Sequence, residues 1–218
     1  IGDFSLIRKL DDWLQRMWLE GNGGGNGGES YEFTAFFYAR YCEMPKAETP
    51  FFIITGDEHL RETLYKTELE TRFGGKHETV EAKQVFDELK EKFKGNVFLI
   101  HRTYGGSGQA DAAIVEQWQR MLGKERVIRL GSDKAIADVT LGLFAIMTGS
   151  RTLDEYCDDM KTKRDKAQDD DRVSEVRASL QQLVAIAPRG KKAATAKGNK
   201  PKSGGKKDAG KGKKPGRL

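Results

Sequence analysis

The chain has 218 residues, 37% hydrophobic and 33% charged, which is enough for one ordinary domain with a core and an appended segment. Residues 189–218 hold twelve Lys or Arg and a single acid, Asp208, for a charge of +11. Because the whole chain carries +5, residues 1–188 carry −6. The composition therefore predicts a mildly acidic globular body followed by a basic tail, and it argues against a uniformly basic protein.

The two cysteines, Cys42 and Cys157, have no metal-site spacing and are too few for a disulfide framework. No apolar run approaches the roughly 20 residues of a membrane span. We therefore expect a protein of a reducing, cytoplasmic compartment that does not enter a membrane. The sequence begins IGDFSLIRKL without an initiating Met, which we interpret as the start of a processed chain or of a fragment.

The first half of the chain alternates between helix and strand signals. Apolar residues at helical spacing predict a helix over residues 4–20. The sequence GNGGGNGG follows from Gly21 to Gly28, and the aromatic-rich residues 29–41 then predict a second helix. Residues 51–55 (FFIIT), introduced by Pro50, form a short continuous apolar run that is typical of a buried parallel strand.

The second half repeats this alternation. A polar helix is expected after His59 as far as the Gly74-Gly75 break, and an amphipathic helix over residues 79–95. The following expected elements are a strand at 96–101, a helix ending at Gly123, a strand at 126–130 and a helix at 133–149 that is apolar on most sides, with Ser132 or Asp133 as its cap. Residues 151–187 predict one or two polar helices.

Strand and helix units of this kind predict a three-layer α/β/α fold of Rossmann type, with an open, mostly parallel sheet flanked by helices. We expect three segments: an α/β domain at 1–150, a helical extension at 151–187 and a Lys/Gly-rich tail at 188–218. The tail has almost no apolar side chains, so it cannot offset its ordering entropy and is predicted to be disordered.

Ligands of open α/β sheets gather at the carboxyl ends of the strands. The loops expected there are residues 55–59, 102–109 and 131–133. The first contains Asp57, Glu58 and His59, whose carboxylates suit a hard cation such as Mg²⁺ or Mn²⁺, although an acid after a strand also commonly caps the next helix. His101 ends the second strand, where it is a candidate general base or a hydrogen-bonded structural residue. Arg102 and the glycines of the second loop are candidates for holding an anion.

The glycine run has alternative interpretations. Its glycines fit a dinucleotide-binding fingerprint in several registers, but the preceding residues look helical rather than extended. No Lys-Ser or Lys-Thr follows the run, which excludes a P-loop. The other interpretation is a surface turn that reverses the chain before the helix at Glu29.

The order IGD, LEG with the glycine run, ESYE, an aromatic helix and a strand ending in GDE resembles a bacterial von Willebrand factor A-type domain. The later stretches WQRMLG, RVIRL and AIADVTLG also look like the second half of such proteins, so the resemblance covers roughly residues 1–150. It implies a doubly wound α/β fold with a metal-ion-dependent adhesion site at its upper edge.

In that site a D-x-S-x-S loop supplies the first ligands, a second loop supplies a hydroxyl-type oxygen, and a third supplies an Asp after a buried strand. The resemblance places Asp57 in the third position and Glu29 or Ser30 in the second. No D-x-S-x-S occurs in this sequence, and Asp3-Phe4-Ser5 matches only the first three positions of that motif. We expect the first strand and its loop to lie upstream of Ile1, and the missing ligands weaken the affinity expected for Mg²⁺ or Mn²⁺.

The tail is a separate signal. Its lysines are spaced by Gly, Ala and Ser without aromatic residues, and they include Lys191, Lys192, Lys206, Lys207, Lys213 and Lys214. This pattern suits salt-sensitive, nonspecific attraction to nucleic acid or another polyanion and not base recognition. The alternative interpretation is a solubilising tail with no dedicated partner.

The sequence thus favours a non-enzymatic, protein-binding module of the A-domain type with a metal-dependent site that is incomplete in this chain. One alternative is an α/β enzyme acting on a phosphorylated or nucleotide substrate through Asp57, Glu58 and His101. A second alternative is a nucleic-acid-associated protein that works through the tail.

Overall fold

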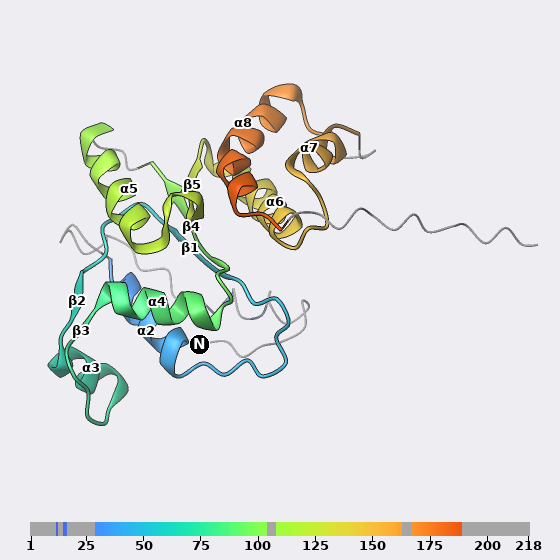
Figure 1. Ribbon diagram of the computed structural model, residues 1–218. Coiled ribbons are helices and arrows are strands. Elements are labelled where there is room, and N and C mark those ends of the chain that lie inside the picture. The colour runs from blue at the N-terminus through green and yellow to red at the C-terminus, as the bar shows by residue number, and fades with distance from the viewer. Residues whose placement is uncertain (1–11, 13–14, 17–28, 104–107, 163–166, 189–218) are drawn as a thin grey trace, which may run out of the picture.

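A computed structural model describes residues 12, 15, 16, 29–103, 108–162 and 167–188 (Figure 1). Its helices and strands, in chain order, are α2 (Tyr31–Arg40), β1 (Phe52–Gly56), β2 (Thr63–Leu64), α3 (Lys66–Phe73), β3 (Val80–Glu81), α4 (Ala82–Lys92), β4 (Val97–Arg102), α5 (Gly108–Leu122), η2 (Lys124–Arg126), β5 (Val127–Leu130), η3 (Asp133–Ala135), α6 (Ile136–Met147), α7 (Leu153–Thr162), α8 (Asp170–Leu180) and η5 (Gln181–Ala185). The helix expected at 4–20, the glycine run and the lysine-rich tail lie almost entirely outside the described residues.

The main sheet has three parallel strands in the order β1-β4-β5, with β4 in the centre. Phe52 is in register with Val97, and Leu99 is in register with Val127. All three strands point the same way, so their carboxyl ends meet at one edge of the sheet. The prediction of a parallel α/β sheet flanked by helices is confirmed.

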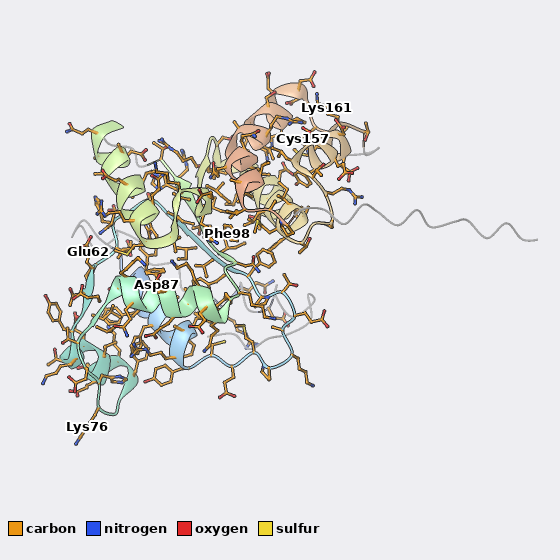
Figure 2. The ribbon with its side chains drawn as sticks, viewed as in Figure 1. Glu62, Lys76, Asp87, Phe98, Cys157 and Lys161 are labelled. Atoms are coloured by element: carbon orange, nitrogen blue, oxygen red, sulfur yellow. The ribbon has the colours of Figure 1, made fainter. Side chains whose placement is uncertain are left out.

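Alternate side chains of β4 enter two separate cores, as the period of two along a strand requires. Val97 and Leu99 pack in the core formed with α2, α4 and α5. Phe98 and Ile100 pack in the core formed with α6, α7 and α8. The two helical layers lie on opposite sides of the strands (Figure 1), and Phe98 marks the centre of the molecule in Figure 2.

Helices α7 and α8 pack against the same sheet. Leu153, Cys157 and Met160 form a buried stripe on α7, and α8 adds Val173 and Val176 to the same core. These positions recur at helical spacing between the acidic and basic residues, so the charged faces of both helices point outward. Cys157 lies between α7 and α8 (Figure 2), and both cysteines are free thiols.

The structure differs from the sequence-based expectation after the first strand. The polar helix expected directly after His59 begins only at Lys66, because residues 63–64 form β2, which pairs antiparallel with β3. Each of these strands has only two residues, too few to show an alternating pattern. Helix α6 also differs: it is preceded by the short η3, and Leu141 is 59% exposed on a helix expected to be buried on most sides.

Candidate functional site

The segment that follows the glycine run docks onto the loop after β1. Glu29 forms an isolated parallel bridge with Leu60, and its backbone N–H donates to the carbonyl oxygen of His59 at 2.9 Å. Ser30 then precedes α2 without capping it through its side chain. Glu29 and Ser30 are both exposed, and Asp57 is half-buried. The structure therefore places Glu29, and Ser30 next to it in the chain, beside the end of the loop that carries Asp57.

The pKa of Tyr31 depends on the charged groups at this edge. Its ring lies beneath the loop so closely that a Cβ added at Gly56 would stand 2.7 Å from Tyr31 Cζ. Burial, together with the charges of Asp57 and Glu29, raises the pKa of the Tyr31 phenol to about 12, although hydrogen bonds from the backbone of Asp57 and Glu58 oppose the shift. Both carboxylates therefore act on one hydroxyl group.

Helix α5 holds the same loop, and its Trp118 ring contacts that of Tyr31 edge-to-face at 5.2 Å. The Trp118 indole N–H donates to the carbonyl oxygen of Glu58 at 3.0 Å. The Gln117 side-chain oxygen accepts from His59 Nδ1 at 2.9 Å and from the Leu60 backbone N–H at 3.1 Å, and its amide donates back to the Leu60 carbonyl at 3.0 Å. His59 thus faces α5 and positions the loop.

His101 does not face the same space as Asp57 and Glu58. It is 0% exposed, and its Nε2 lies 2.7 Å from Asp111 Oδ1 on α5. The other Asp111 oxygen accepts from Arg129 Nη2 at 2.7 Å, while His101 Nδ1 has no hydrogen-bond partner. The result is a cluster of a buried histidine, a buried carboxylate and a largely exposed guanidinium that links the carboxyl ends of β4 and β5 to α5.

The remaining edge loops are joined to each other. Arg102, the last residue of β4, forms a salt bridge with Asp133, which follows β5. The guanidinium that the sequence offered for an anion is therefore engaged by a carboxylate. Residues 104–107 of the intervening loop lie outside the described residues.

The described residues contain no group of three or more His, Cys, Asp or Glu side chains arranged to hold a metal ion. The edge formed by Glu29, Ser30 and Asp57 offers two carboxylates and a hydroxyl. Mg²⁺ is commonly held by one or two carboxylates while it keeps several of its waters. These donors therefore fit a largely hydrated cation and not a fully enclosed one.

Sequence reasoning missed Tyr31, Trp118 and Gln117, the residues that position the loop. Tyr31 lies in the ESYE stretch and Trp118 in an amphipathic helix, where both read as ordinary core aromatics. Gln117 could have been found from the sequence, because it lies three residues after Ile114, on the apolar face of the expected helix. An amide buried on such a face requires hydrogen-bond partners, and in the structure Gln117 is only 7% exposed.

Within the described part of the chain, no helix is both long and apolar enough to cross a membrane. A scan against models of protein families finds no match, and searches among curated proteins and among solved structures find none either.

Proposed function

We propose that the chain is a non-enzymatic protein-interaction module of the von Willebrand factor A type, and that its binding edge contains Glu29, Ser30 and Asp57. The observation that carries this proposal is the bridge between Glu29 and Leu60. It joins the segment after the glycine run to the GDE loop at the carboxyl edge of a parallel sheet, the edge at which open α/β sheets bind ligands.

A divalent cation, Mg²⁺ or Mn²⁺, fits this proposal as a weakly held ligand of Asp57, Glu29 and Ser30. When bound, it would supply a positive centre that accepts a carboxylate from a protein partner. The chain's own residues hold the edge in place: Tyr31 supports the loop from beneath, and Trp118 and Gln117 fix its backbone from α5. This support keeps the binding groups in one arrangement before a partner arrives.

The alternative of an α/β enzyme acting on a phosphorylated or nucleotide substrate has less geometric support. It requires Asp57, Glu58 and His101 to converge, but His101 is buried against α5 and already paired with Asp111.

A second alternative is that the lysine-rich tail binds a polyanion, and this is a separate proposal. Removal of residues 189–218, followed by a salt-dependent DNA shift assay, tests that role.

Isothermal titration of the chain with Mg²⁺ and with Mn²⁺ tests the cation part of the proposal. We expect one weak site, strengthened when acetate is present as a stand-in for a partner carboxylate, and lost in Asp57→Ala. Asp154→Ala is the matched control, because Asp154 is an exposed acid on α7, in the layer on the opposite face of the sheet. Identical titrations for the wild type and Asp57→Ala would overturn the cation part of the proposal.

A further inference from the structure

Arg61 joins the loop that carries Asp57 to the first turn of α2. It directly follows Leu60, which forms the bridge with Glu29. The Arg61 Nε donates to Glu32 Oε1 at 3.1 Å, and the Arg61 backbone N–H approaches Glu32 Oε2 at 3.4 Å. The end of the loop and the start of α2 are therefore held together by a side chain as well as by the backbone bridge.

The Glu32 carboxyl group depends on these two donors. Glu32 is 0% exposed, so water cannot replace them, and a buried polar group that loses its partners is costly. Glu32 lies only three residues after Glu29, and the position of its carboxyl group therefore affects where Glu29 and Ser30 enter α2. Any change that releases Glu32 from Arg61 acts directly on this entry.

Helix α3 holds the other side of the same guanidinium. Arg61 Nη1 and Nη2 donate to the two Glu68 oxygens at 2.9 Å and 2.8 Å, a bidentate pair with the first turn of α3. The guanidinium also lies over the Phe33 ring, with its Cζ 5.1 Å from the ring centroid. A planar guanidinium can bond two carboxylates at once in a fixed geometry, which a lysine ammonium cannot reproduce. Helix α3 therefore sets the orientation in which Arg61 reaches Glu32.

We propose that Arg61 is the positioning residue of the binding edge, and that α3 controls this edge through Glu68. While Arg61 bonds Glu32, the start of α2 is held against the end of the loop and the bridge from Glu29 to Leu60 stays closed. When the guanidinium is released, the bridge opens more often and the two sides of the edge separate. The inference rests on the proposed function only in taking this edge as a binding site, because the state of the bridge can be measured without a ligand.

Amide hydrogen exchange of the Glu29 N–H in the 218-residue chain tests the proposal, because this N–H donates to the His59 carbonyl while the bridge is closed. We expect its exchange to be roughly tenfold faster or more in Arg61→Gln, since hydrogen bonds to charged groups are among the stronger ones in proteins. Arg61→Lys should restore part of the protection, because it keeps the charge but not the planar fork. Glu68→Gln should give a smaller acceleration, since it weakens the hold of α3 but leaves the bond between Arg61 and Glu32.

Arg40→Gln is the matched control. Arg40 is also an α2 arginine: it bonds both Glu88 oxygens at 2.8 Å and 2.9 Å, and its Cζ lies 4.6 Å from the Phe36 ring centroid. This variant loses the same kind of interaction at the opposite end of α2, so exchange at Glu29 should match that of the wild type. The Leu99 amide, in the central strand β4, shows whether each variant remains folded.

Exchange at Glu29 that is unchanged in Arg61→Gln, or that rises equally in Arg61→Gln and Arg40→Gln, would overturn the proposal. If Arg61→Gln does not fold, Glu68→Gln decides, and unchanged exchange at Glu29 in that variant would overturn it. Mn²⁺ titration of the same variants separates positioning from binding. Absence of Mn²⁺ binding by the wild type would contradict the binding site alone, whereas Mn²⁺ binding with unchanged Glu29 exchange in Arg61→Gln would contradict the positioning role alone.

Discussion

The backbone N–H of Glu29 lies 2.9 Å from the carbonyl oxygen of His59, and this hydrogen bond joins two segments that flank the candidate site. The loop carrying Asp57 is held at its base by Tyr31 and at its far end by Gln117 of α5. A loop fixed at both ends presents its side chains in one arrangement, which a binding site requires.

Gly56→Ala should destabilise the fold and displace Tyr31. The added Cβ would overlap the Tyr31 hydroxyl and lie 2.7 Å from Cζ, and the ring is confined by its edge-to-face contact with Trp118 at 5.2 Å. Overpacking of this kind costs about 1–3 kcal/mol of unfolding free energy. Urea denaturation measures the loss.

The control for this substitution is Gly108→Ala at the start of α5. An added Cβ there meets no atom within 4 Å, so the change should be neutral or slightly stabilising. Equal losses in the two variants would contradict the packing of Tyr31 against Gly56.

The sheet could be predicted from sequence because its strands are strongly apolar. FFIIT, NVFLIH and RVIRL are each bounded by charged residues or turn formers, and each became a strand of the parallel sheet. The antiparallel pairing of β2 with β3 could not be predicted, since Thr63–Leu64 and Val80–Glu81 are separated by helix α3 and carry no periodic pattern.

The candidate site was only partly accessible from sequence. The order of motifs predicted Glu29 and Ser30 beside Asp57, and in the structure Glu29 bridges Leu60 at the end of the loop that carries Asp57. His101 was expected at the same edge. Strand alternation puts it on the side of Val97 and Leu99, toward α5, but the sequence does not identify Asp111 and Arg129 as its neighbours.

Asp111→Ala should be among the most damaging single changes in the α5 layer. It would leave His101 buried without its hydrogen bond and would remove the ion pair with Arg129. Leaving a buried polar group without its hydrogen-bond partner costs about 1–3 kcal/mol. Thermal unfolding followed by circular dichroism measures the effect.

Arg129→Ala should cost much less, because the Arg129 side chain is 60% exposed and solvent screens its pair with Asp111. If the Arg129 variant were as unstable as the Asp111 variant, the buried bond between His101 and Asp111 would not be the main contribution of this cluster.

Glu32→Gln should change the pH dependence of stability. Burial raises the pKa of the Glu32 carboxyl above its ordinary value of 4.5, against the opposing effect of Arg61, whose Nε lies 3.1 Å away. The folded state therefore keeps the proton longer than the unfolded state. The resulting stabilisation is complete below about pH 4.5 and is lost as the pH rises through the folded-state pKa.

Unfolding free energies of the wild type and Glu32→Gln, measured from pH 4 upward in about half-unit steps, should therefore diverge as the pH rises, with the wild type losing stability relative to the variant. Glu116→Gln serves as the control, because the Glu116 side chain is 75% exposed. A constant difference between the wild type and Glu32→Gln at every pH would contradict the raised pKa.

The central claim is that Glu29, Ser30 and Asp57 form one binding edge at the carboxyl end of the sheet. Titration with Mn²⁺, followed by paramagnetic broadening of the backbone amide resonances, tests it most directly. The account predicts that the amides of Glu29, Ser30 and Asp57 broaden first, and that this selectivity disappears in Asp57→Ala. Broadening that spares these residues, or that is the same in Asp57→Ala, would contradict a binding edge formed by these three residues.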